Sequence, residues 1–115
     1  MQHTVTLNNE TFNLVLSTYK ADNSISISLY TQDNIPFAHL TNCQPDINLP
    51  YNQIVVKLYS ENEVLKPLIK DKTFIDTGIK IPSGFVELNI WEITNQDLLD
   101  DIEKIKLQNE TLHTN

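Results

Sequence analysis

The two glycines of the chain, Gly78 and Gly84, lie six positions apart with Pro82 between them. Average composition would give roughly eight glycines in a chain of 115 residues, so this placement constrains the local fold. Glycine adopts positive φ without steric cost and proline fixes its own φ, which together favour a tightly shaped connection. We therefore predict such a connection over residues 76–85, leading directly into a strand over residues 86–93.

The first third of the chain has the alternation of apolar and polar residues that is typical of half-buried strands. In the clearest case, three serines alternate with Ile25, Ile27 and Leu29. Short clusters of Asn, Asp and Gln separate such segments and predict turns. We predict a four-stranded antiparallel meander from residue 2 to about residue 42, with strands over residues 4–7, 12–17, 24–29 and 36–40.

A strand and a helix are expected next in the chain. The apolar run over residues 53–59 predicts a fifth strand. Ser60 and Glu63 then have the spacing of a capping box, which indicates a helix over about residues 61–70. Pro67 falls inside this helix and should kink or shorten it, because proline lacks the backbone N–H.

The C-terminal segment predicts a second helix over about residues 95–107, with Thr94 as its N-cap. Carboxylates in its first half and lysines in its second half agree with the helix dipole. Its apolar residues recur with helical spacing and form one stripe: Leu98, Leu99, Ile102 and Ile105.

These segments indicate the α+β class, with a mostly antiparallel sheet of about six strands and two helices (about 61–70 and 95–107). The length and the 40% hydrophobic content suit a single domain over residues 1–110, followed by a frayed tail over residues 111–115. No secretion signal or long apolar run is present in the sequence, so we expect a soluble, cytoplasmic protein that does not contact membranes.

The charge distribution argues against nucleic-acid binding. The formal net charge is −7, and all eight basic residues are lysines. Arginine is the usual residue for bidentate contacts to phosphate and guanine, and it is absent. Residues 81–103 contain six carboxylates and no base, so this part of the surface should attract cationic partners.

The sequence offers no convincing catalytic or metal site. Cys43, His39 and Asp46 are the one conceivable nucleophile set, but strand spacing would separate positions 39 and 43 by about 13 Å. A single cysteine excludes an internal disulfide and a multi-cysteine zinc site. His3 and His113 share no metal-ligand spacing with His39, and we expect them to be solvated. We therefore predict a protein that is not an enzyme and has no cofactor or metal.

One face of the expected strand over residues 86–93 is a candidate partner-binding surface. Phe85 and Trp91 bracket Glu87 and Asn89 on this face, and exposed aromatic residues with polar groups between them resemble protein-binding hot spots. In the alternative interpretation the final helix covers this face, so that both aromatic side chains belong to the core.

Four carboxylates of the final helix form a second candidate partner-binding surface. They are Asp97, Asp100, Asp101 and Glu103. Their spacing lacks the alternating oxygen ligands and the glycine of an EF-hand loop. The alternative is an ordinary solvated helix face on which local lysines pair with some of these carboxylates.

Several short motifs, spread over about residues 36–92, resemble a small domain family of unknown function encoded on conjugative elements and phages of Gram-positive bacteria. The resemblance implies a mobile-DNA context and identifies no catalytic residue. The motifs are Pro36-Phe37-Ala38, Leu40-Thr41, Tyr59-Ser60-Glu61-Asn62-Glu63, Asp76-Thr77-Gly78 and Ser83-Gly84-Phe85-Val86-Glu87.

Two functional hypotheses follow from the sequence. In the first, the protein is a non-enzymatic, acidic accessory protein of a phage or mobile element. It would bind and inhibit a host protein with a basic surface, for example a nucleic-acid-binding defence nuclease, as anti-CRISPR proteins do. In the second, it is a structural or assembly module that forms a homo-oligomer through an exposed sheet edge.

Overall fold

The computed structural model describes residues 3–19, 24–42, 47, 49–50, 52–58, 60–71 and 73–113. Two members of the nucleophile set considered above, Cys43 and Asp46, lie outside these residues. The side chains of Ser60 and Glu63, on which the expected capping box depends, also lie outside the described part of the chain.

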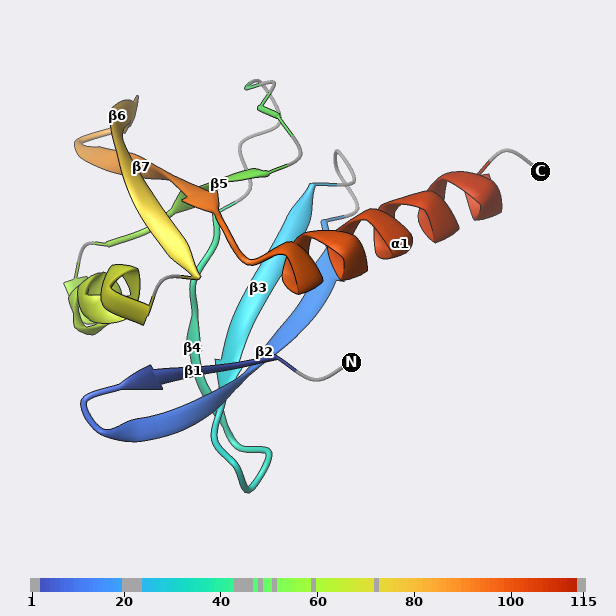
Figure 1. Ribbon diagram of the computed structural model, residues 1–115. Coiled ribbons are helices and arrows are strands. Elements are labelled where there is room, and N and C mark those ends of the chain that lie inside the picture. The colour runs from blue at the N-terminus through green and yellow to red at the C-terminus, as the bar shows by residue number, and fades with distance from the viewer. Residues whose placement is uncertain are drawn as a thin grey trace.

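The N-terminal part of the chain forms a four-stranded antiparallel sheet in the order β1-β2-β3-β4, which confirms the expected meander (Figure 1). Asn8 and Asn9 connect the first two strands and both have positive φ, 52° and 66°. Two such residues are the signature of a type I′ turn, whose twist matches that of the flanking strands. The strands are β1 (His3–Leu7), β2 (Glu10–Thr18), β3 (Ile25–Tyr30) and β4 (Pro36–His39).

A second antiparallel sheet has three strands in the order β5-β7-β6. They are β5 (Gln53–Val56), β6 (Phe74–Ser83) and β7 (Val86–Ile93). The expected strand over residues 86–93 is confirmed. The expected connection over residues 76–85 is wrong for most of its length, because β6 pairs with β7 as far as Ser83. The α+β class holds, with seven strands in two sheets rather than about six in one.

Gly78 lies in a bulge of β6, where residues 77–79 face the single residue Ile90 of β7. Its φ is 82°, and its N–H donates to Oδ1 of Asp76 at 2.9 Å. The Thr77 hydroxyl donates to the Ile90 carbonyl at 2.8 Å. Side chains therefore satisfy backbone groups that the bulge takes out of the ladder, and glycine supplies the backbone conformation.

Gly84 is the first residue of the two-residue turn between β6 and β7, and its φ is 63°. Glycine is the preferred residue at this position of a type II′ turn, because side chains disfavour positive φ there. Both glycines thus have the positive φ expected from the sequence.

The two helices differ in type. Residues Ser60–Asp71 form a 3₁₀ helix, η1, where a helix was expected, and Pro67 lies inside it. Proline removes one backbone donor and clashes with the preceding turn of an α-helix, which disfavours α-helical geometry here. The C-terminal α-helix, α1 (Gln96–His113), is longer than expected and includes the first residues of the tail expected over 111–115.

Asn95, rather than Thr94, caps α1. Oδ1 of Asn95 accepts the N–H of Leu98 at 3.1 Å, and the Asn95 carbonyl accepts the N–H of Leu99 at 3.1 Å. The Thr94 N–H instead donates to the carbonyl of Thr73 at 2.9 Å. The helix therefore begins one residue later than expected, with a side chain that is equally suited to the N-cap position.

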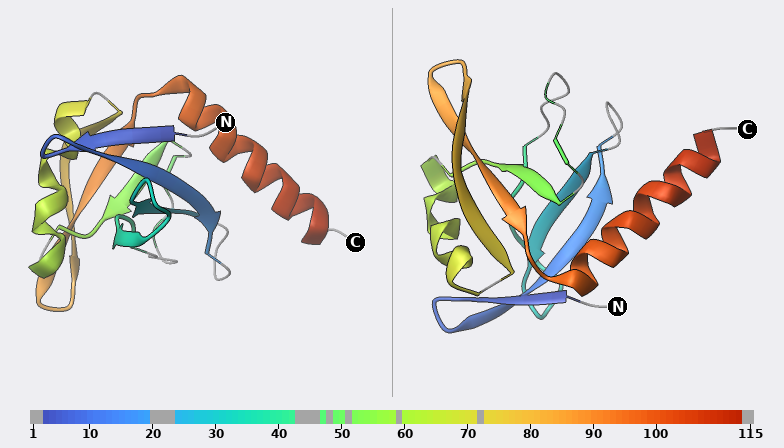
Figure 2. Two further views of the ribbon diagram at one scale, coloured as in Figure 1. Left: turned by 90° about the horizontal axis from the view of Figure 1, so that it is seen from below. Right: turned by 45° about the horizontal axis from the view of Figure 1, so that its top comes forward.

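The two sheets enclose one main core, as Figure 2 shows from two sides. They meet where Thr41 bridges Val56 and where the N–H of Asn42 donates to the Val55 carbonyl at 2.9 Å. On the far side, η1 packs against both β1 and β6. The arrangement resembles an incomplete barrel that η1 closes and that α1 covers with its apolar residues Leu98, Leu99 and Ile102.

Strand β7 is buried on both faces near its C-terminal end. Trp91 and Ile93 belong to the main core, whereas Leu88 and Ile90 pack with Val55 in a second, smaller cluster. The hairpin of β6 and β7 extends beyond the core at its turn (Figure 1). The exposure of a β7 residue therefore depends on its distance from the turn as well as on the face it occupies.

Candidate partner-binding surfaces

The aromatic pair predicted from the sequence is split between surface and core. Phe85 is fully exposed at the β6–β7 turn, whereas Trp91 is 1% exposed and packs on Phe74 with a centroid distance of 5.7 Å. Between them, Glu87 is exposed and Asn89 is half-buried. The exposed interpretation is thus correct for Phe85 and Glu87, and the core interpretation for Trp91.

Three exposed apolar side chains lie along the hairpin, Ile75 and Ile79 in β6 and Phe85 at the turn, and together we call them the hairpin surface. Ile79 is 53% exposed and lies in the bulge. The sequence contained a signal for this surface, because apolar residues stood inside a stretch that was expected to be a turn. The exposed Phe85 ring at the turn suits contact with an apolar pocket of a partner.

Three carboxylates of the first turns of α1 point away from the core. They are Asp97, Asp100 and Glu103, which we call the acidic face. Their three-residue spacing places them on one side of the helix. The buried residues Leu98, Leu99 and Ile102 occupy the other side. Nε2 of Gln96 donates to Oδ1 of Asp100 at 2.9 Å, a contact within the first turns of the helix.

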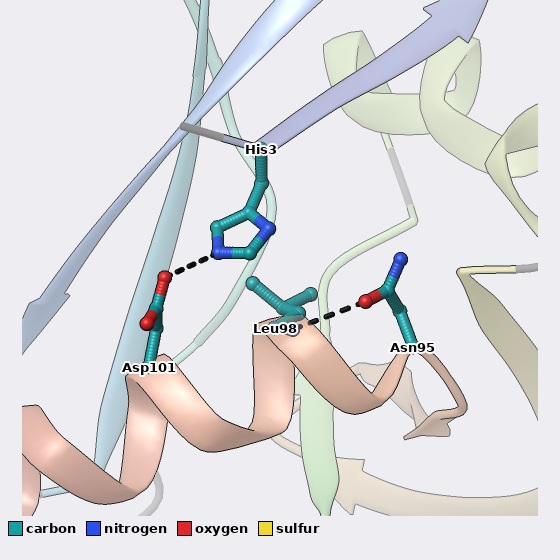
Figure 3. Close-up of polar contacts among 4 residues, drawn as sticks. All are labelled: His3, Asn95, Leu98 and Asp101. Atoms are coloured by element: carbon teal, nitrogen blue, oxygen red, sulfur yellow. Dashed lines mark hydrogen bonds and ion pairs between the residues drawn. The ribbon is translucent and has the colours of Figure 1, made fainter. Parts of the chain in front are cut away.

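Asp101 does not belong to the acidic face, contrary to the expectation from the sequence. Its Oδ2 lies 2.6 Å from Nε2 of His3, which is only 9% exposed (Figure 3). The hydrogen bond from His3 lowers the pKa of Asp101 and favours its ionised form. The expectation of a solvated His3 is therefore wrong. A signal for this was present, because His3 has the same parity in β1 as the buried Val5 and Leu7.

A pocket of about 220 Å³ lies beside this contact, between the two N-terminal strands and the start of α1. It was not foreseen from the sequence, because its walls come from three distant segments. The lining residues are His3, Thr4, Leu14, Thr73, Asn95, Asp97 and Leu98.

His39, the last residue of β4, contacts a hydroxyl group of β3 and one of the residue that follows β2. Its Nδ1 lies 2.7 Å from Oγ of Ser28, and its Nε2 lies 2.6 Å from the hydroxyl of Tyr19. The Tyr19 hydroxyl also lies 3.0 Å from Oγ1 of Thr41. Oγ1 of Thr41 in turn accepts the N–H of Ile27. Partial burial lowers the pKa of His39, and the positive charge of Lys57 lowers it further.

His39 thus holds strands together through hydrogen bonds to hydroxyl groups. The sequence had suggested this histidine only as a partner of Cys43 in a nucleophile set. Within the described residues, no group of three His, Cys, Asp or Glu side chains is placed to hold a metal ion. No helix in the described part of the chain combines the length and apolar character needed to cross a membrane.

The β6–β7 turn, which carries Phe85, points away from α1, which carries the acidic face (Figures 1 and 2). The fold therefore does not join the two candidate surfaces into one patch. Comparison of the chain with protein-family models, curated proteins and solved structures found no match.

Proposed function

We propose that this chain is a non-enzymatic accessory protein of a phage or mobile element that binds and inhibits a host protein with a basic surface. The single observation that carries the proposal is the acidic face of α1. Asp97, Asp100 and Glu103 are all exposed on one side of the helix, at a net charge of −7 for the whole chain. The resemblance to a family of mobile elements supplies the biological context.

The geometry of this face suits a protein that normally binds nucleic acid. Residues three apart on a helix rise about 4.5 Å along its axis. This is of the same order as the axial spacing of about 3.4 Å between phosphates of one DNA strand. A nuclease groove that neutralises phosphates with lysine and arginine would therefore meet a row of carboxylates at a comparable spacing. We infer that a defence nuclease is the kind of partner that this face fits.

The alternative, an assembly module that pairs through a sheet edge, has weaker support. The outer strand β6 is interrupted by the bulge at residues 77–79 and contains Pro82, and both features discourage edge pairing. The edge of β1 faces η1. The other sheet edges are those of β4 and β5, each only four residues long, and residues 41 and 42 already pair with β5.

The proposal is tested by capturing partners from a lysate of a low-GC Gram-positive bacterium at low and at high salt. We expect a basic protein that is retained at low salt and released as ionic strength rises, because screening shortens the reach of exposed charges to below about 8 Å. The purified partner should then lose nuclease activity when the protein is added. A partner retained equally at both salt concentrations, or a protein that itself shifts a DNA duplex in a gel, would contradict the proposal.

A further inference from the structure

We propose that His39 is a pH-sensitive latch, which holds Tyr19 against Thr41 only while its imidazole ring is neutral. Tyr19 directly follows β2, and Thr41 lies where the two sheets meet, since it bridges Val56 of β5. Nε2 of His39 lies 2.6 Å from the Tyr19 hydroxyl, which lies 3.0 Å from Oγ1 of Thr41. The latch therefore ties the end of β2 to the junction of the two sheets.

The direction of these hydrogen bonds is determined at Thr41. Its Oγ1 accepts the N–H of Ile27 at 3.1 Å, and the residue is only 2% exposed. Among the contacts of the described residues, the oxygen of Tyr19 is the acceptor that the Thr41 hydroxyl proton can reach. A buried hydroxyl proton without an acceptor is costly, so Thr41 donates to Tyr19.

This direction determines which nitrogen of the neutral His39 ring carries the proton. Tyr19 accepts from Thr41 and uses its one hydroxyl proton to donate to Nε2, which is then the acceptor nitrogen of the ring. The ring proton is therefore on Nδ1, which donates to Oγ of Ser28 at 2.7 Å. In this state every proton of the network, from Thr41 through Tyr19 and His39 to Ser28, has an acceptor.

Protonation of His39 removes this order, because the ring gains a donor and loses its acceptor. Nε2–H must then donate to the oxygen of Tyr19. If the Tyr19 proton turns toward Thr41, the buried Thr41 proton loses its acceptor. If it turns away, the Tyr19 oxygen accepts two protons and its own proton needs a partner outside the network. Either change ends the head-to-tail arrangement in which each hydrogen bond strengthens the next, so the link between Tyr19 and Thr41 weakens.

The surroundings of the ring favour its neutral form. Partial burial lowers the pKa of His39, and the positive charge of Lys57, which follows β5, lowers it further. Tyr19 is a second titratable group in contact with the ring, and β3 contributes the hydroxyl of Ser28. The latch should therefore be closed at neutral pH and should open as pH falls through the lowered pKa of His39, below the ordinary value of about 6.5.

The test follows the His39 ring and the amide of Ile27 in the full chain by NMR. Imidazole ¹⁵N shifts, assigned by their absence in His39→Gln, report which ring nitrogen carries the proton. We expect the proton of the neutral ring on Nδ1, although the free side chain prefers it on Nε2. Exchange protection of the Ile27 amide, corrected for the intrinsic pH dependence of exchange, should fall severalfold as His39 is protonated, because Thr41 is then held less firmly.

Two tyrosine variants separate the latch from a general effect of acid. Tyr19→Phe removes the latch hydroxyl and keeps the ring. Nε2 of His39 then loses its donor, so the share of the Nδ1–H tautomer should fall and the protection of Ile27 should no longer follow the titration of His39. Tyr30→Phe removes a hydroxyl from β3 outside this network and should behave like the parent.

A parent chain with the neutral ring protonated on Nε2 overturns the proposal, and so does Ile27 protection that stays constant while His39 titrates. Equal responses of Tyr19→Phe and Tyr30→Phe overturn it as well. The tautomer is measured on the parent chain, so this part of the test holds even if Tyr19→Phe fails to fold. The latch is independent of the proposed basic partner, and none of these measurements requires that partner.

Discussion

Nε2 of His3 lies 2.6 Å from Oδ2 of Asp101, so a hydrogen bond joins the first strand to the last helix across 98 positions of sequence. This contact and the apolar stripe of α1 hold the helix against the four-stranded sheet. We expect His3→Ala and Asp101→Asn each to lower the melting temperature measured by circular dichroism. Asp100→Asn is the control and should melt like the parent. The contact is not structural if all three variants melt alike.

Protonation of Asp101 should lower the stability of the folded chain at acidic pH. Its pKa is lower in the folded chain, so the unfolded chain binds the proton more readily and the contribution to stability is present above the ordinary Asp pKa of about 3.9. The contribution is lost as pH falls through the lowered folded pKa. Urea titrations at several acidic pH values measure this loss, which should be absent in Asp101→Asn.

A separate step is expected from His39. Its folded pKa is also lowered, which means that the folded chain prefers the neutral imidazole. Stability should therefore fall as pH drops below the ordinary His pKa of about 6.5, because the unfolded chain gains a proton that the folded chain resists. In His39→Gln, the urea concentration at the unfolding midpoint should therefore change less with pH over this range. An unchanged slope in the variant would show that other groups cause it.

Both glycines should be sensitive to substitution for reasons of backbone conformation alone. A Cβ at either position would meet no atom within 4 Å, but φ is 82° at Gly78 and 63° at Gly84. Gly78→Ala and Gly84→Ala should each destabilise by about 1 kcal/mol or more in chemical denaturation. Lys80→Ala, at an exposed site in β6, is the control and should change stability by less than about 0.5 kcal/mol. Parent-like stability of both glycine variants would show that the turn and bulge tolerate other conformations.

Removal of α1 should expose the main core. Leu98 and Ile102 are fully buried, and truncation to alanine at such sites costs about 2–5 kcal/mol. We expect each alanine variant to be strongly destabilised, and a chain ending at Thr94 to unfold or aggregate in size-exclusion chromatography. Leu107→Ala, at a residue 54% exposed, should be nearly neutral. A monomeric, fully folded truncated chain would mean that the helix serves a partner rather than the core.

The acidic face is tested by matched double variants. Asp100→Asn with Glu103→Gln should slow association with the proposed basic partner severalfold and reduce its salt dependence, because both charges would steer the encounter. Glu10→Gln with Asp33→Asn removes the same charge from exposed sites elsewhere and should have a smaller effect. Equal association rates for the two double variants would assign any attraction to net charge alone.

Local patterns in the sequence were sufficient for the meander, the α+β class, the positive φ of both glycines and the apolar stripe of α1. Each of these depends on residues close together in the chain. Ile25, Ile27 and Leu29 alternate with serines whatever lies beyond them, and a strand with one buried face follows directly. Pro67 and the two glycines restrict the backbone by their own covalent structure.

The tertiary structure decided which residues of the candidate surfaces meet solvent. The sequence pattern does not distinguish the exposure of Phe85 from that of Trp91. In the fold, the hairpin turn projects past the core, whereas the other end of β7 lies in it. Asp101 and His3 become partners only because α1 packs across the end of β1, and Thr73 joins them in one pocket by the same packing. Burial and pairing of this kind depend on contacts between segments that are distant in sequence. Patterns among neighbouring residues therefore cannot predict them.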